Sequence, residues 1–411
     1  MNHFIKNIHI NGLFHLNNFD IPIADAHYPH LIITGKNGSG KTILLNAIVE
    51  FVDKIKQDTN LYFLERPKWL QNAEIQMQKA DDEVSLAKAQ IHLDEMKNSY
   101  NNLYGKVSVS FNNVADVVRK YRDGDFIIAF YEAERKPYMA EPKTPTKPKY
   151  SIKGDSKKTA TDQLLNFLSD LKIQAALASN ENMKQAAEDI TKWFDSFEHL
   201  LRRIFKDDKL SLIFNFRNYE FTIHSEGKKF NFNQLSAGYA AVLDIVVDLI
   251  LKMQNNNSLS SVYNKEGIVF IDEVEAHLHL ALQKDIMQIL TEIFPNIQFV
   301  VTTHSPFILS SIPSAVAYDL EHREILSDLT EYSYESLAEG YFGVMSPSSY
   351  IEMQLKRLKD LLEKKDKTES DKVEIKQLSD DFKKIPESVA PLVVGGYLQL
   401  ATQYSDLINS L

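Results

Sequence analysis

The residues best placed for chemistry form one short segment, Gly35-Lys36-Asn37-Gly38-Ser39-Gly40-Lys41-Thr42, with the spacing G-x-x-x-x-G-K-[ST]. Glycines at these positions let the backbone curl so that successive N–H groups point at phosphate oxygens. The lysine would reach the outer phosphates of a nucleotide, and the threonine hydroxyl would ligate Mg²⁺. The alternative is a glycine-rich turn that binds nothing. The phosphate-contacting residues of the predicted nucleotide site are Gly35, Asn37, Gly38, Ser39, Gly40, Lys41 and Thr42.

The elements on either side of this segment are those that a phosphate-binding loop requires. Residues 30–34 are a short apolar run that predicts a buried strand, and residues 43–49 begin a helical pattern. The N-terminus of that helix adds a partial positive charge at the phosphates. This strand–loop–helix setting favours the phosphate-binding interpretation over the plain turn.

Two later strands each end in a polar side chain. The apolar run 267–271 is followed by Asp272 and Glu273. In a nucleotide site Asp272 would hold the Mg²⁺ shell and Glu273 would polarise the attacking water. The run 297–303 is followed by His304, which would sense the γ-phosphate from the carboxyl end of its strand. The alternatives are solvated carboxylates and a structural histidine.

A fourth segment, Leu235-Ser236-Ala237-Gly238-Tyr239, precedes a predicted helix over 240–254. Ser236 suits a helix N-cap and Gly238 permits close approach of another backbone. A serine with free N–H groups at a helix N-terminus can bind an anion. Taken alone, the segment is better explained as a helix cap.

The four segments occur in the order used by ABC-class ATPase heads, and the chain resembles that family. Residues 273–279 (Glu-Val-Glu-Ala-His-Leu-His) and 303–306 (Thr-His-Ser-Pro) are more narrowly similar to its OLD-, RecF- and SMC-like AAA branch (AAA_15 and AAA_21). That branch occurs in bacterial anti-phage systems of the Septu, PARIS and OLD types. The resemblance covers roughly residues 1–60 and 105–320.

The resemblance implies an α/β fold: an ABC-type P-loop ATPase head with a mixed sheet, an antiparallel N-terminal β-subdomain and a helical subdomain. It implies ATP and Mg²⁺ as cofactors, with Thr42 and Asp272 at the metal. Glu273 would be the catalytic base and His304 the switch. A trans signature would contact ATP bound to a second protomer through Leu235, Ser236 and Gly238, and His277 would lie in the segment that crosses between protomers.

The chain also departs from the family pattern. Ala237 stands where the transporter-type signature has glycine, and Tyr239 stands where it has glutamine, which weakens a transporter interpretation. The glutamine that usually follows an early strand has no clear equivalent, although Glu134 or Arg135 lies after the predicted strand 126–131. No convincing Toprim nuclease follows the head.

The functional hypothesis is an ATP hydrolase that forms a homodimer or higher oligomer on ATP and regulates a separate effector, a nuclease or toxin, in anti-phage defence. The first alternative is a DNA-repair or DNA-end-binding ATPase. A cytosolic transporter subunit and a non-hydrolysing scaffold are further alternatives.

The composition limits the partners and the compartment. The chain has 411 residues, a formal net charge of −10 and no cysteines. The acidic balance argues against broad non-specific nucleic-acid binding, although a local basic patch could still bind it. The absence of cysteine fits a cytoplasmic protein. No apolar run approaches the roughly 20 residues that span a bilayer, so we expect no membrane partner.

The pattern along the chain predicts five regions. They are an N-terminal ATPase lobe (1–57), a helical insert (58–104), strands and a loop (105–160), the helical subdomain with the later motifs (161–320), and a mostly helical C-terminal region (321–411).

The sequence pattern also predicts turns, a helix break and an exposed loop at particular positions. Turns are expected at Asn11-Gly12 and near Asn17-Asn18, and a break in the C-terminal helices is expected over 393–397. The proline- and lysine-rich segment 137–158 predicts an exposed loop. Such a loop could contact nucleic-acid phosphates, but a solvated loop is favoured.

Overall fold

The computed structural model describes residues 3–23, 30–135, 138–142, 156–254, 264–326, 347–385 and 391–409. The chain divides into two compact units, Met1–Tyr332 and Ser333–Leu411. Among the described residues, no helix combines the length and the apolar character needed to cross a membrane.

A six-stranded mixed sheet forms the centre of the first unit, with the strand order β12-β11-β3-β10-β9-β5. All neighbouring pairs are parallel except β11 and β12. The strands β3, β5 and β10 are buried along their whole length, as expected for parallel strands covered on both faces. The strands are β3 (His30–Thr34), β5 (Phe126–Tyr131), β9 (Glu266–Ile271), β10 (Ile297–Thr302), β11 (Ala315–Asp319) and β12 (Glu324–Leu326).

A second, antiparallel sheet has the order β2-β1-β4 and is built from β1 (Ile5–Leu13), β2 (Leu16–Pro22) and β4 (Val107–Phe111). The two predicted turns are wrong, because Asn11-Gly12 lies inside β1 and Asn17-Asn18 lies inside β2. The hairpin turns at Phe14 and His15 instead, where Phe14 takes a φ of 56°. The amide of Asn11 is held within the sheet because its Nδ2 donates to Tyr104 O and Ser108 Oγ.

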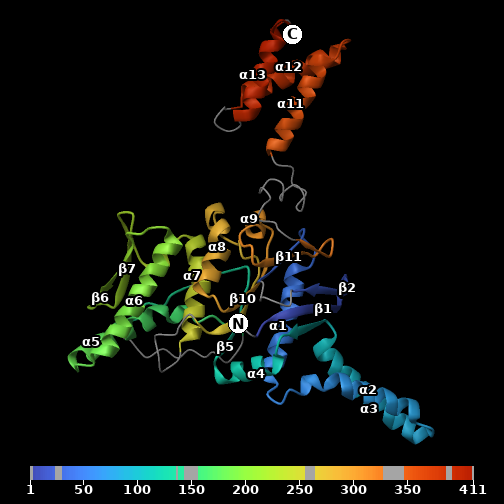
Figure 1. Cartoon of the computed structure of the whole chain (residues 1–411), viewed down its shortest axis with the longest axis vertical. Coiled ribbons are helices and arrows are strands. Elements are labelled where there is room, and N and C mark those ends of the chain that lie inside the picture. The colour runs from blue at the N-terminus through green and yellow to red at the C-terminus, as the bar shows by residue number, and fades with distance from the viewer. Residues whose placement is uncertain are drawn as a thin grey trace. The chain divides into compact units, whose positions relative to one another are not determined.

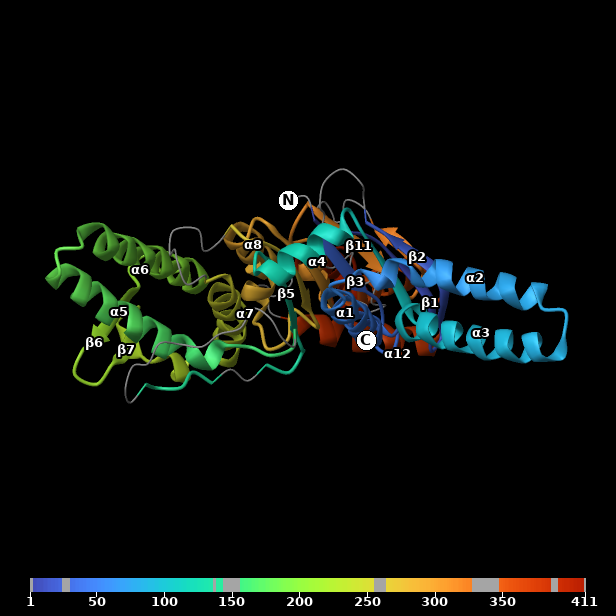
Figure 2. The same cartoon turned by 90° about the horizontal axis from the view of Figure 1, so that it is seen from below.

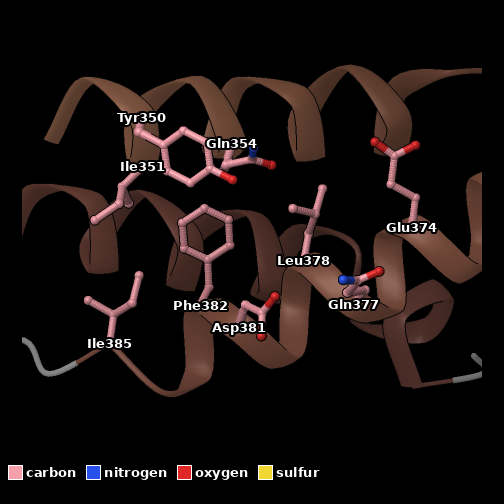
Figure 3. Close-up of a pocket in the computed structure, with 9 residues that line it drawn as sticks. All are labelled: Tyr350, Ile351, Gln354, Glu374, Gln377, Leu378, Asp381, Phe382 and Ile385. Atoms are coloured by element: carbon pink, nitrogen blue, oxygen red, sulfur yellow. The ribbon is translucent and has the colours of Figure 1, made fainter. Parts of the chain in front are cut away.

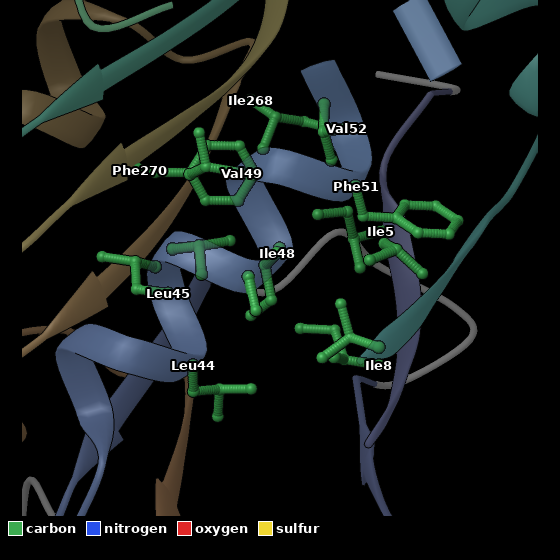
Figure 4. Close-up of a cluster of buried hydrophobic side chains, with 14 of the residues drawn as sticks. Ile5, Ile8, Leu44, Leu45, Ile48, Val49, Phe51, Val52, Ile268 and Phe270 are labelled. Atoms are coloured by element: carbon green, nitrogen blue, oxygen red, sulfur yellow. The ribbon is translucent and has the colours of Figure 1, made fainter. Parts of the chain in front are cut away.

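Helix α1 (Lys41–Gln57) packs between the two sheets, and its buried side chains tie them into one core. Figure 4 shows its middle turns facing Ile268 and Phe270 of the central sheet on one side and Ile5 and Ile8 of the antiparallel sheet on the other. Helix α4 (Val114–Asp123), which the sequence pattern did not predict, covers the same core through its buried apolar face.

The predicted helical insert is confirmed as a hairpin of two packed helices. It comprises the short turn η1 (Tyr62–Leu64), α2 (Arg66–Lys79) and α3 (Glu83–Tyr104). Figures 1 and 2 both show α2 and α3 side by side, extending away from the sheets. Asp82 caps α3 by accepting hydrogen bonds from the backbone N–H groups of Val84 and Ser85.

The remaining elements of the first unit include a mostly helical lobe with its own three-stranded sheet, β6-β7-β8. The sequence pattern over 210–223 predicts a hairpin, and the first two strands of this sheet pair antiparallel as that pattern requires. The elements are η2 (Thr161–Gln163), α5 (Leu164–Asn180), α6 (Lys184–Phe205), β6 (Ser211–Asn215), β7 (Glu220–Ser225), β8 (Lys228–Phe230), η3 (Phe232–Gln234), α7 (Ala237–Met253), α8 (Leu280–Ile293) and α9 (Pro306–Leu309).

The predicted loop over 137–158 lies largely outside the described residues. Where it is described, Tyr138, Glu141, Lys157 and Lys158 are exposed as expected, whereas Met139 and Ser156 are buried. Met139 is held because its backbone N–H donates to Asn233 Oδ1, and the Ser156 hydroxyl donates to Asp53 Oδ2.

The second unit consists of α11 (Pro347–Glu363), α12 (Glu369–Lys383), α13 (Pro391–Gln403) and α14 (Ser405–Asn409), with a small apolar core of its own. A pocket of about 360 Å³ lies between α11 and α12, lined by Tyr350, Leu378 and Phe382 among others (Figure 3). The predicted break at 393–397 is wrong, because α13 runs through it. Tyr397 is buried there, and a Cβ on Gly396 would lie 2.9 Å from Leu355 Cδ2, so packing outweighs the low helix propensity of glycine.

The predicted fold class is confirmed. The chain is α/β, with a mixed central sheet, an antiparallel N-terminal sheet, a helical subdomain, a helical insert and a helical C-terminal region. In this sheet β10 lies between β3 and β9, so the three strands that precede the predicted site residues are direct neighbours.

Candidate nucleotide site

The loop between β3 and α1 has the backbone of a phosphate cradle. Gly35, Gly38 and Gly40 have φ values of 139°, 85° and 99°, in the region that favours glycine. At Gly35 a side chain would also collide, because a Cβ there would lie 2.9 Å from Ser39 Oγ. The glycines therefore let the loop curl tightly and enter α1 with free N–H groups at its first turn.

Lys41 is buried inside the curl. Its Nζ donates to Gly35 O at 2.8 Å and to Lys36 O at 3.0 Å. Burial lowers the pKa of Lys41 to about 8, although the carboxylates of Glu273 and Glu275 oppose that shift. The ammonium group is therefore held among carbonyls at the centre of the loop, with acidic side chains close by.

The end of β9 meets the start of α1 through a direct side-chain contact. Thr42 Oγ1 donates to Asp272 Oδ1 at 3.2 Å, which joins residues 230 positions apart in sequence. Thr302 Oγ1, from the end of β10, donates to the same Asp272 oxygen at 2.6 Å. A hydroxyl and a carboxylate side by side supply the hard oxygen donors that Mg²⁺ prefers, so these residues fit the predicted ion.

Glu273 follows Asp272 with a φ of 43°, which is uncommon for a residue with a side chain. Its backbone N–H donates to Thr302 Oγ1 at 2.8 Å, and its carbonyl accepts from Arg135 Nη2 at 2.6 Å. None of the hydrogen bonds and ion pairs found within the described residues uses the Glu273 carboxylate. The peptide backbone is fixed while the carboxylate is left available for a water.

The end of β10 is held by a second carboxylate, Glu275. It accepts from Thr303 Oγ1 at 2.8 Å and from the backbone N–H of His304. Burial raises the pKa of Glu275. The pKa of His304 is lowered from its ordinary value of 6.5, mainly by burial and secondly by the positive charge of Lys41. This shift favours the neutral imidazole, which can donate one hydrogen bond and accept another.

The turn between β9 and α8 explains why the helix begins later than predicted. A helix over 276–293 is expected from the sequence pattern, but α8 starts at Leu280. Glu273 and His277 both take positive φ values, which a helix does not allow. The residues before Leu280 instead form a turn that contains Glu273 and leaves His277 exposed.

The segment 235–239 lies at the start of α7. Ser236 is the N-cap residue of that helix, but its side chain makes no cap hydrogen bond and it is exposed. Leu235 is half-buried, and a Cβ on Gly238 would lie 3.1 Å from His277 O. Tyr239 stacks on Phe205 with ring centroids 4.4 Å apart, which accounts for an aromatic residue here. No hydrogen bond found among the described residues uses the Ser236 hydroxyl.

The structure brings together the side chains predicted from the ends of three strands, and it adds others. Arg135, a candidate for the missing glutamine position, donates to the backbone carbonyls of Asp272 and Glu273. Glu134, the other candidate, lines a neighbouring cavity of about 400 Å³. His15 Nε2 lies 3.0 Å from Ser39 O, so the β1–β2 turn also supports the phosphate loop. His15, Thr302 and Glu275 were not predicted.

Within the described ranges, one group of three side chains could hold a metal ion by proximity: Asp319, His322 and Glu324. Its central carboxylate is already used, because Asp319 Oδ1 accepts from the backbone N–H of Glu321 and Asp319 Oδ2 lies 2.6 Å from His322 Nδ1. These contacts close the turn between β11 and β12. The group is distinct from the predicted ligands Thr42 and Asp272.

Residues 148–310 match a family model described as AAA domain, putative AbiEii toxin, Type IV TA system (AAA_21). The predicted resemblance to AAA-type P-loop ATPases is confirmed. The matched residues include Ser236, Asp272, Glu273 and His304, whereas the phosphate loop precedes them.

Several curated proteins are similar to the chain. The Retron Vc95 probable ATPase of Vibrio cholerae serotype O1 biovar El Tor is 23% identical over 385 residues, covering 77% of this chain and 74% of that protein. Septu protein PtuA of Bacillus mycoides (strain KBAB4) is 33% identical over 159 residues, covering 36% of this chain and 22% of that protein. The Retron Ec83 probable ATPase of Escherichia coli is 42% identical over 83 residues, covering 20% of this chain and 15% of that protein.

Two solved structures are also similar to the chain, at low identity. The SMC head domain from Thermotoga maritima is 12% identical, with a TM-score of 0.35, covering 76% of this chain and 94% of that chain. A nucleotide-free ATP-binding cassette from an ABC transporter is 15% identical, with a TM-score of 0.35, covering 85% of this chain and 97% of that chain.

Proposed function

We propose that this protein binds Mg²⁺ and ATP at the carboxyl edge of its central sheet and hydrolyses the γ-phosphate. The observation that carries this proposal is the contact of Thr42 with Asp272, reinforced by Thr302. It joins the start of the helix behind the phosphate loop to the first carboxylate after β9, which is the arrangement that a nucleotide-bound Mg²⁺ requires.

The phosphate loop would hold the nucleotide through backbone N–H groups and Lys41. The carbonyls of Gly35 and Lys36 hold the ammonium at the centre of the curl, so it needs little reorganisation to face phosphate oxygens. Mg²⁺ at Thr42 and Asp272 would supply charge neutralisation for the phosphates. The residues that we assign to the phosphates are Gly35, Asn37, Gly38, Ser39, Gly40, Lys41 and Thr42.

Glu273 would accept a proton from the attacking water. Its carboxylate is not occupied by the described hydrogen bonds, and its backbone is fixed on both sides. His304, whose pKa is lowered by burial, would bridge the water and the γ-phosphate from the end of β10. Both side chains lie at the same sheet edge as Lys41, which influences the pKa of His304.

We further propose that two copies of the chain close over ATP. Ser236 is exposed and makes no cap hydrogen bond, which leaves its hydroxyl available to a phosphate of the partner's nucleotide. Leu235 and Gly238 would complete this trans signature, and the exposed His277 would lie in the segment that crosses between the two protomers. Such closure would exclude water and complete each site from two chains.

The relatives suggest the setting of this activity. They are named as retron ATPases and Septu proteins, and the alignment spans about three quarters of one but less than a quarter of the others. We propose that the chain acts in anti-phage defence, coupling its ATP cycle to a separate effector protein such as a nuclease or toxin. If duplex DNA instead bound tightly and stimulated hydrolysis, the DNA-repair alternative would be favoured.

The test is a pair of variants, Glu273→Gln and Glu220→Gln. Glu273→Gln keeps the shape of the side chain but removes its charge, so we expect ATP to bind normally and hydrolysis to fall about 100-fold or more. Glu220→Gln changes an exposed carboxylate on β7, remote from the phosphate loop, and should hydrolyse like the unchanged protein. Binding is measured by calorimetry and hydrolysis by phosphate release. Normal hydrolysis by Glu273→Gln would remove it from the base role.

A further inference from the structure

Arg135 is a buried arginine that lies directly beneath the proposed catalytic turn. It follows β5, the neighbour of β9, and only 7% of its surface is exposed. Its Nη2 donates to Asp272 O at 3.1 Å and to Glu273 O at 2.6 Å. Its Nε donates to Glu132 O at 3.0 Å, so the guanidinium ties the end of β5 to the turn after β9.

We propose that Arg135 is a positioning residue for ATP hydrolysis, which fixes the backbone of Glu273 and thereby the direction of its carboxylate. The inference rests on the proposed function, because it assigns a supporting residue to the same site. Arg135 acts in this proposal through two carbonyl oxygens and without contact to the nucleotide.

The conformation of Glu273 explains why such support is needed. A φ of 43° places the residue in the left-handed region, which costs free energy for any residue with a Cβ. Strained conformations of this kind persist only where the surroundings hold them. Without partners for its peptide groups, Glu273 would relax toward a negative φ and its carboxylate would point elsewhere.

The partners come from both neighbouring strands. From β10, Thr302 Oγ1 accepts from the backbone N–H of Glu273 at 2.8 Å. From the β5 side, Arg135 donates to the carbonyls before and after that residue's Cα. The two side chains thus hold opposite ends of one residue, so losing Arg135 leaves only the Thr302 contact and the ordinary backbone bonds of the turn.

The chemistry of arginine suits this task better than that of lysine. A planar guanidinium presents several donors in a fixed fork, whereas an ammonium is a compact point charge. Arg135 also lies near Asp244 and Glu275, whose charges oppose the lowering of its pKa by burial. The group is therefore a buried cation whose donors serve the backbone of the site, at the border of the cavity that Glu134 lines.

The experiment measures ATP affinity and single-turnover hydrolysis separately for Arg135→Gln and Arg135→Lys. We expect affinity within about threefold of the unchanged protein, because no phosphate contact is lost. We expect hydrolysis to fall at least about 30-fold in both variants, since a misdirected catalytic group commonly costs about 100-fold. Arg66→Gln is the matched control, because Arg66 Nη1 also donates to a backbone carbonyl, Ser99 O, but within the α2–α3 hairpin.

A rescue experiment separates positioning from a general loss of structure. Arg135→Ala opens a space beside the cavity of about 400 Å³, through which millimolar guanidinium can enter. We expect added guanidinium to restore hydrolysis at least about fivefold in Arg135→Ala and to leave Glu273→Gln inactive. If Arg135→Ala does not fold, the Gln and Lys variants still decide the matter through their affinity and turnover.

Specific outcomes would overturn the proposal. Unchanged hydrolysis in Arg135→Gln, or a loss of affinity as large as the loss of hydrolysis, would show that Arg135 does not position Glu273. If Glu273→Gln is inactive while Arg135→Gln is normal, this inference fails and the proposed function stands. If Glu273→Gln hydrolyses ATP normally, the proposed function itself fails.

Discussion

At the residue scale, the charge of Lys41 depends on what fills the phosphate loop. Burial lowers its pKa to about 8 when carbonyls are its direct partners. Phosphate oxygens would stabilise the ammonium form and raise that pKa again. Binding of ATP above pH 8 should therefore be coupled to the uptake of a proton by the protein.

We predict an uptake of roughly 0.7 proton per ATP at pH 8.5, falling toward zero at pH 7. Calorimetric titrations in two buffers of different ionisation enthalpy measure this number directly. Lys41→Arg is the matched control, since an arginine stays charged throughout this range, so the ATP binding that it retains should proceed without uptake. Identical apparent enthalpies in both buffers for the unchanged protein would contradict the assignment.

The residues that the sequence predicted and those that it missed differ in a simple way. Asp272 and His304 follow apolar runs, where a polar residue is conspicuous, and Lys41 is marked by the glycine spacing before it. Thr302 is the last residue of β10, and threonine is a common residue in strands. Its hydroxyl nevertheless forms hydrogen bonds with both Asp272 and Glu273. Its importance comes from the neighbouring strand, which a single sequence does not reveal.

At the element scale, β3 and β10 are joined by a buried histidine as well as by their backbones. The backbone N–H of Phe299 donates to His30 Nδ1 at 3.1 Å, which requires that nitrogen to be unprotonated. Burial lowers the pKa of His30 from 6.5 to about 4. Protonation must therefore break this contact and place a charge in the sheet.

The folding stability depends on pH through His30. Between pH 6.5 and 4 the unfolded chain binds a proton at His30 that the folded chain does not, so folding stability falls as the pH falls. We predict a loss of about 2 kcal/mol between pH 7 and pH 5 from this residue. His30→Gln, whose amide oxygen can accept the same N–H, should lack that part of the decline. Urea unfolding at several pH values measures the difference, and parallel curves for both proteins would refute it.

Elements were predicted best where local pattern and tertiary packing agree. The buried strands β3, β5, β9 and β10 consist of apolar runs, which are not expected in a strand at the surface. The pattern failed where packing outweighs propensity. Gly12 continues β1, Gly396 continues α13, and α8 is shortened because the residues before it build the Glu273 turn. The predicted division into five regions stays a prediction.

At the scale of the whole molecule, the central question is whether one site is built from two chains. In the first unit, Ser236 at the start of α7 makes no cap hydrogen bond, and no described hydrogen bond joins residues 235–239 to residues 35–42. The proposal that Ser236 serves a partner's nucleotide makes a prediction about mixtures of inactive proteins.

Lys41→Ala and Ser236→Arg should each be inactive alone, the first through loss of a phosphate contact and the second through a bulky cation at the signature. In a mixed dimer, one shared site collects both defects and the other has an intact loop and an intact signature. We predict that mixing under subunit exchange restores single-turnover hydrolysis in up to half of the sites of each mixed dimer. Single turnover is the suitable measurement because a continuing cycle can require both sites.

The matched control is a mixture of Lys41→Ala with Glu273→Gln. Both defects then lie on the phosphate-loop side of a shared site, so each site of the mixed dimer keeps one of them and no hydrolysis should return. If the site were built within one chain, neither mixture would recover, because every chain carries a defect. Recovery in the first mixture alone supports a shared site. Failure of both, with mixed dimers demonstrated by mass spectrometry, would leave Ser236 with no role beyond the start of α7.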